Sequence, residues 1–249
     1  MRDGTCRLCS QTKPLVKAHI IPRCFFHRLR GGAKQLFAGI VREKQPVEYS
    51  QSGFWDDNIL CAGCESLFGE WDAYGFEVLG NPPGNNGPLS TDADLQAFIL
   101  RNVDYTKLKL FILGTLWRAS VTKHKFFEEI DLGPDEPHIG NLIRNGQPGP
   151  MEEYPVIIGR LIRQRYEQVI FTPWTSKLEG INVCVLYLPA VKIIIRVDKR
   201  PLPPELVVVA LKPFGENIAL PLPLEGTEFQ KLQAMKDISM RWQPRRPPK

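Results

Sequence analysis

Four of the chain's six cysteines occur as two C-x-x-C pairs, and no other sequence feature limits the fold as strongly. The first pair is Cys6 and Cys9, and the second is Cys61 and Cys64. A C-x-x-C on a tight turn presents two thiolates to one ion, so two such turns complete the four-ligand shell of a structural zinc site. The sequence therefore predicts one Zn²⁺ ion that joins the two turns and contributes to the folding of this segment.

Paired cysteines have two other roles, core packing and thiol–disulfide exchange. The sequence around the pairs lacks the strand-to-helix context of a thioredoxin-like motif, and thiols that share a metal ion are not free for exchange. Zinc is therefore the preferred interpretation. The isolated Cys24 and Cys184 stand among apolar neighbours and are expected to pack in the core.

The composition is that of an ordinary globular protein, with 43% hydrophobic and 24% charged residues. Its apolar runs are shorter than the roughly 20 residues that a membrane helix needs. Residues 1–6 are not followed by the apolar stretch of a signal peptide. Because C-x-x-C pairs in a reducing compartment favour metal binding over disulfides, we expect a cytoplasmic protein without a membrane partner.

Positive charge is concentrated near both ends of the chain. Residues 1–47 carry ten Lys and Arg against two acidic residues, and residues 236–249 carry five against one, which gives local net charges of +8 and +4. Such patches can bind phosphates through counterion release, although solvated surface explains them equally well. We expect nucleic acid as the partner, DNA more than RNA. The candidate contacts are Lys17, Arg23, Arg28, Arg30 and Lys34.

Composition divides the chain into four segments. Residues 1–80 hold both cysteine pairs, and residues 81–91 are rich in Pro, Gly and Asn, as is typical of a linker. Residues 92–235 are expected to form an accessory or recognition domain that could bind a protein partner or assemble a homo-oligomer. Residues 236–249 form a basic tail.

Apolar periodicity beyond the linker predicts helices and then strands. Helical spacing predicts a pair of helices at 92–102 and 106–122. β-Branched runs predict strands at 155–158, 167–171, 181–188 and 191–197, with a tight hairpin at 189–190 and a further strand at 205–211. The expected fold class is α+β, in which a zinc-stapled N-terminal module precedes a helical pair and a small antiparallel β-sheet.

The order of motifs in the N-terminal segment resembles the HNH, or ββα-metal, endonucleases. After the first C-x-x-C comes K-A-H-I-I-P over residues 17–22, which is similar to the H-[IV]-x-P context on that family's first strand. The second C-x-x-C is preceded by W-D-D-N-I-L over residues 55–60 and followed directly by Glu65. The resemblance covers the cysteine-bearing segment and says nothing about the rest of the chain.

This resemblance implies a ββα frame in which a histidine activates water while a divalent ion stabilises charge on the phosphate. His19 matches the general base, and the four cysteines match the ligands of the structural Zn²⁺. Glu65 replaces the family's last metal-binding histidine. Asp56 stands at the spacing of the family's asparagine, and Asn58 lies only three residues before Cys61. Mg²⁺ or Mn²⁺ would be held by Glu65 and Asp56, because Mg²⁺ prefers oxygen ligands.

The expected function is that of a metal-dependent endonuclease that hydrolyses phosphodiester bonds, in a bacterial or phage-related defence setting that the resemblance alone suggests. Ala18 stands where the family often has a residue that helps to hold the ion. The alternative is therefore a catalytically degenerate zinc module that binds nucleic acid or a protein partner. In that case Glu65 would simply favour the start of a helix, and Asp56 or Asn58 would cap a turn.

Overall fold

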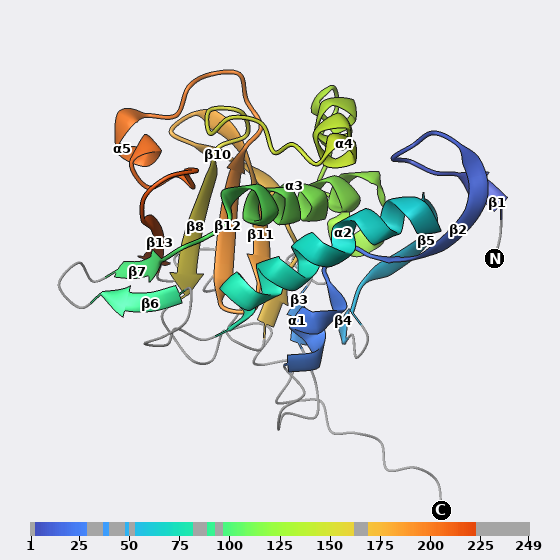
Figure 1. Cartoon of the computed structure of the whole chain (residues 1–249), viewed down its shortest axis with the longest axis horizontal. Coiled ribbons are helices and arrows are strands. Elements are labelled where there is room, and N and C mark those ends of the chain that lie inside the picture. Colours follow the sequence, from blue (N-terminus) through green and yellow to red (C-terminus); the bar gives the residue numbers. More distant parts are fainter. Residues whose placement is uncertain are drawn as a thin grey trace, which may run out of the picture.

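The structure is a computed structural model that describes residues 3–28, 37–39, 48–49, 53–81, 89–92, 97–161 and 169–222. It is a mixed α+β fold with three sheets in these residues (Figure 1). In the described part of the chain, no helix is both long and apolar enough to cross a bilayer.

The N-terminal segment contains a three-stranded antiparallel sheet followed by a helix. Its elements are β1 (Asp3–Thr5), β2 (Thr12–His19), α1 (Arg23–Arg28), β5 (Trp55–Cys61) and α2 (Ala62–Gly75), which continues as a π-helical segment (Phe76–Gly80). The strand order is β1-β2-β5, and His19 at the end of β2 lies opposite Trp55. The register shifts between Val16 and Ala18, so β5 carries a bulge next to its first residues.

The larger sheet has seven strands in the order β10-β11-β12-β8-β13-β7-β6. They are β6 (Leu89–Asp92), β7 (Ala97–Leu100), β8 (Val156–Leu161), β10 (Trp174–Leu178), β11 (Ile181–Leu188), β12 (Val191–Arg196) and β13 (Asn217–Leu222). A third sheet has the order β4-β3-β9, with β3 (Phe37–Gly39), β4 (Glu48–Tyr49) and β9 (Val169–Phe171). The expectation of a small antiparallel sheet is wrong. Strand β13 runs parallel to β8, and two further strands, β7 and β6, extend the sheet beyond β13.

The remaining helices lie after residue 104. They are α3 (Tyr105–Val121), a 3₁₀ turn (Lys125–Phe127), α4 (Asp135–Asn145) and α5 (Pro204–Val207). The helix predicted at 106–122 is therefore confirmed by α3, whose first turn is capped by the Asp104 side chain accepting from the Lys107 N–H. The sequence analysis did not anticipate α4.

Two predicted elements are wrong. The helix predicted at 92–102 is replaced, where the structure describes this range, by the strand Ala97–Leu100, which pairs with β13 and places Ile99 opposite Ile218. This apolar run is compatible with both the helical and the strand period, and its pairing in a buried sheet makes it a strand. The strand expected at 205–211 is instead α5 followed by a turn, and Ala210 alone bridges to Ile157 of β8.

One hydrophobic cluster runs from Cys6 to Ala219 and includes residues of β5, α2, α3 and the large sheet. In Figure 1, α3 crosses the strands of this sheet, and α2 lies alongside α3. Almost every residue of α3 is buried, including polar ones. The N-terminal segment therefore shares its core with the rest of the described chain.

Two glycines of α2 provide a matched test of this packing. A Cβ on Gly75 would collide with the Phe111 ring of α3, whereas a Cβ on exposed Gly69 would meet nothing within 4 Å. We expect Gly75→Ala to lower the free energy of unfolding by about 2 kcal/mol through overpacking. Gly69→Ala should raise it by about 1 kcal/mol, because alanine is the better helix former. Urea denaturation followed by circular dichroism checks both values, and equal effects of the two variants would contradict this packing of α2 on α3.

Candidate metal centre

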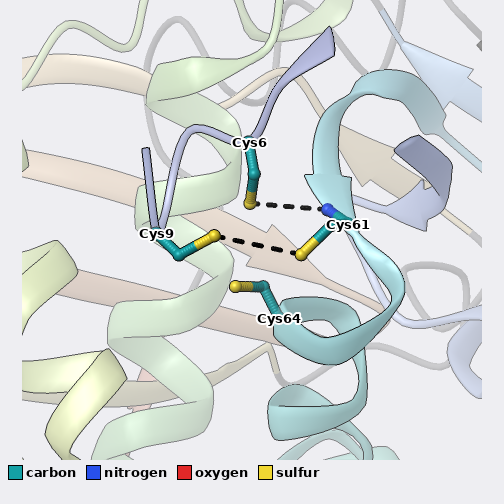
Figure 2. A group of neighbouring side chains, drawn as sticks. All are labelled: Cys6, Cys9, Cys61 and Cys64. Atoms are coloured by element: carbon teal, nitrogen blue, oxygen red, sulfur yellow. Dashed lines mark hydrogen bonds between the residues drawn. The ribbon is translucent and has the colours of Figure 1, made fainter. Parts of the chain in front are cut away.

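Two turns of the N-terminal segment bring four cysteine side chains together. Cys6 and Cys9 lie on the turn between β1 and β2, Cys61 ends β5, and Cys64 lies in the first turn of α2 (Figure 2). All four sulfur atoms lie within 4.8 Å of one another. The predicted cysteine cluster is therefore present, and in Figure 2 the four side chains point towards a common centre.

The sulfur separations suit a metal ion better than a disulfide. The Cys9 and Cys61 sulfurs are 4.0 Å apart, whereas a disulfide requires about 2.05 Å. A tetrahedron with metal–sulfur bonds of 2.3 Å has edges of about 3.8 Å. The four thiols could therefore hold a metal ion such as zinc with little movement.

Main-chain hydrogen bonds shape the first turn of the cluster. The Ser10 N–H donates to the Cys6 carbonyl at 2.8 Å, and the Arg7 N–H donates to the Ile59 carbonyl of β5 at 2.8 Å. Ser10 has a left-handed backbone with φ of 60°. The Cys61 N–H donates to the Cys6 sulfur at 3.4 Å. Hydrogen bonds thus join the two turns to each other independently of a metal ion.

The electrostatics of the cluster also favour a cation. Burial raises the pKa of the Cys64 thiol, and the neighbouring thiols raise it further. Four thiolates so close together require a divalent cation, which deprotonates the thiols that it binds. Cys6, Cys61 and Cys64 are buried and Cys9 is half-buried. Such a closed shell of four protein ligands is the arrangement of structural rather than catalytic sites.

The first turn of the cluster also contacts α4. The Arg7 guanidinium forms an ion pair with Glu136 at 2.8 Å. Leu8 is buried, and a Cβ on Gly140 of α4 would lie 3.7 Å from its side chain. The cysteine cluster is therefore tied to the central core as well as to its own hairpin.

Glu65 lies beside the end of β2. Its carboxylate accepts a hydrogen bond from the main-chain N–H of His19, whereas its Oε2 atom is buried and has no hydrogen-bond partner. Burial raises the pKa of Glu65 to about 7; nearby Arg118 acts in the opposite direction, and Asp72 adds to the rise. Two of the residues singled out from the sequence, His19 and Glu65, are thus brought together.

Behind Glu65 lies a buried ion pair that the sequence analysis missed. Arg118 of α3 is fully buried and donates to both carboxylate oxygens of Asp72 at 2.8 Å, with its guanidinium 4.6 Å from the Phe68 ring centroid. Glu65, Phe68 and Asp72 share one face of α2, since they are three or four residues apart. An arginine that directly follows the mainly apolar run 110–117 was the available signal.

The side chains of Asp56 and Asn58 form hydrogen bonds with other residues of the chain. Asp56 Oδ2 accepts from the Thr122 hydroxyl at 2.7 Å, and its Oδ1 accepts from the Asn58 N–H at 2.8 Å. Burial acts to raise the pKa of Asp56, but these hydrogen bonds outweigh it and lower the pKa. The exposed Asn58 side chain donates to Asp56 and Asp57. Both residues therefore shape the β5 bulge and tie it to the end of α3.

Within the described residues, the four cysteines are the one cluster of three or more Cys, His, Asp or Glu whose ligand atoms lie close enough for a shared ion. His19, Asp56 and Glu65 form no second cluster of this kind. Their catalytic roles stay predictions.

The predicted nucleic-acid contacts are placed only in part. Lys17 is exposed on β2, and its ammonium lies 4.1 Å from the centroid of the Trp55 ring. Arg23 is exposed at the start of α1. The side chain of Arg28, together with Arg30 and Lys34, lies outside the described part of the chain.

The described part of the chain thus contains a closed four-thiol centre, a half-buried histidine and, beside it, a half-buried glutamate whose Oε2 atom is buried. This arrangement is suited to holding a structural metal ion and to general acid–base chemistry next to it. No family model matches this chain, and no curated protein and no solved structure matches it either.

Proposed function

We propose that this protein is a metal-dependent endonuclease of the HNH type, with a structural zinc ion at its four cysteines. One observation carries the proposal. The Glu65 carboxylate lies at the end of β2, bonded to the main chain of His19, and its second oxygen is buried without a partner. A general base and an available oxygen ligand on adjacent elements are what such an enzyme requires.

The zinc ion has a structural role in this proposal. Four thiolates are soft ligands that select zinc, and a shell of four protein ligands leaves no position for water or substrate. The ion would fix the start of α2 against β5 and the first turn, and so hold Glu65 beside β2. Catalysis would then depend on the geometry that the zinc maintains.

His19 would take the proton from the attacking water as general base. Glu65 would be the protein ligand of Mg²⁺ or Mn²⁺, because Asp56 already uses both of its oxygens within the protein. When bound, that ion would supply stabilisation of the negative charge on the phosphate. Lys17 and Arg23 are exposed and would contact the phosphate backbone, with DNA expected more than RNA.

A second candidate is a zinc module that binds nucleic acid or a protein partner without cleaving it. Two observations favour it. Asp56 and Asn58 are engaged in the bulge, and Ala18 offers no ligand. This candidate keeps the zinc and the basic residues but needs no second ion.

Cleavage of plasmid DNA by the zinc-loaded protein, at low salt with Mg²⁺ or Mn²⁺, tests the proposal. We expect His19→Ala to reduce the rate by about 10²-fold to 10⁴-fold, the usual contribution of a general base. His138→Ala is the matched control, because His138 is an exposed histidine on α4 paired with Glu153, and it should cleave normally. Glu65→Gln should raise the Mg²⁺ concentration needed for half-maximal rate.

Zinc content and thermal stability of each variant separate loss of chemistry from loss of folding. If the zinc-loaded wild type cleaves neither DNA nor RNA with either ion, the endonuclease is excluded and the binding module takes its place. If His19→Ala cleaves as fast as His138→Ala, His19 is not the general base.

A further inference from the structure

An exposed tryptophan stands at the end of the hairpin, across the strands from His19. Trp55 is the first residue of β5 and is 39% exposed. The register places it directly opposite His19. Side chains paired in this way have Cβ atoms about 5 Å apart, so the ring lies within one side-chain length of the proposed general base.

One lysine contacts this ring, and a second is held near the same strand from a distant part of the chain. The Lys17 ammonium lies 4.1 Å from the ring centroid, a cation–π contact. Asp56, the next residue of β5, accepts hydrogen bonds from the Thr122 hydroxyl and the Lys123 main-chain N–H. These bonds hold the exposed Lys123 next to the start of β5, although it lies far away in sequence.

The surroundings of Trp55 differ from those of the other strongly exposed apolar side chains in the described residues. Phe214 and Val208 are more exposed, at 85% and 66%; Val208 has no ring, and no lysine or arginine of the described residues lies over the ring of Phe214. A flat aromatic ring combined with nearby lysines is the arrangement that proteins use for unpaired bases and their phosphates. The combination therefore points to one class of ligand.

We propose that Trp55 stacks on an unpaired nucleobase, while Lys17 and Lys123 contact the flanking phosphates. The ligand is consequently single-stranded nucleic acid, because bases in a duplex are already stacked and their faces are covered. In the free protein the flexible Lys17 side chain covers the ring. On binding, the base takes its place and the ammonium turns to a phosphate. This inference rests on the proposed function, since it identifies the substrate of the site at His19.

The test is binding of fluorescein-labelled oligonucleotides to the full-length, zinc-loaded protein without Mg²⁺, followed by fluorescence anisotropy. The probes are a single-stranded DNA, the same sequence as single-stranded RNA, and the DNA duplex. The wild type should bind a single strand at least about tenfold more tightly than the duplex. Comparison of the single-stranded DNA with the single-stranded RNA shows whether the affinity depends on the sugar.

The variants separate stacking from charge. Trp55→Leu should weaken single-strand binding by about 10-fold to 100-fold, the usual effect of losing one stacked base. Trp55→Phe keeps an aromatic ring and should retain most of the wild-type affinity for the single strand, whereas Phe214→Ala should bind like the wild type. Lys17→Ala with Lys123→Ala should lower the dependence of log Kd on log salt concentration by about 1.4, at roughly 0.7 for each lost phosphate contact to a single strand.

Equal binding by Trp55→Leu and the wild type would overturn the inference, as would tighter binding of the duplex than of the single strand. These outcomes are distinct from failure of the endonuclease. If the protein binds single strands through Trp55 but never cleaves, the stacking site is supported and the endonuclease is excluded. If it cleaves a duplex and the rate does not depend on Trp55, the endonuclease is supported and the stacking site is excluded.

Discussion

Replacement of Cys64 by alanine is expected to abolish stoichiometric zinc binding and to lower the free energy of unfolding by at least about 5 kcal/mol. Zinc binding by four-ligand sites contributes about 10–16 kcal/mol in small zinc-binding peptides, which is as large as the whole stability of a typical domain. The loss should extend beyond the hairpin, because Leu8, next to Cys9, packs against α4 and Cys61 ends β5. The transition should therefore remain a single one that also includes α3.

Metal analysis and thermal denaturation check this expectation. The wild type should contain one zinc ion per chain, released by a thiol-modifying reagent. Cys24→Ala is the matched control, because Cys24 is half-buried outside the cluster and burial raises the pKa of its thiol to about 11. It should retain one zinc ion. A zinc-free wild type, or a Cys64→Ala protein as stable as Cys24→Ala, would contradict the metal site.

Replacement of Arg118 by methionine is expected to lower the free energy of unfolding by about 3–5 kcal/mol. The change leaves the Asp72 carboxylate buried against α3 without its two hydrogen bonds, and an uncompensated buried charge is far more costly than a missing pair. Burial raises the pKa of Asp72 even with Arg118 present. The deficit should therefore shrink as the pH falls towards about 4, because protonation removes the unpaired charge.

The matched control removes both charges. Arg118→Met combined with Asp72→Leu should recover most of the stability, since apolar residues of similar volume often replace a buried ion pair at little cost. Urea denaturation of the wild type, the single variant and the double variant at pH 7 and pH 5 measures these differences. A double variant less stable than Arg118→Met would show that the pair stabilises the α2–α3 contact beyond neutralising its own charges.

Several features were predictable because the information for them is local. The spacing within each C-x-x-C determines which thiols can share an ion, and the structure places all four within 4.8 Å of one another. The apolar period identified α3, and the β-branched runs identified β8, β11 and β12. The hairpin at 189–190 was also predictable, and Ala190 adopts the left-handed backbone that its tight turn requires.

Other features depend on segments that meet only in the folded chain. Ala97–Leu100 is a strand because β13, more than a hundred residues later, offers it a partner. Arg118 is buried because Asp72 faces it from another helix, and Lys123 lies next to the start of β5 because Asp56 accepts hydrogen bonds from its main-chain N–H and from the Thr122 hydroxyl. The contact of Glu65 with the His19 main chain likewise follows from how α2 packs on β2. Spacing and period act over a few residues, whereas burial and charge pairing are decided by which surfaces the tertiary structure brings into contact.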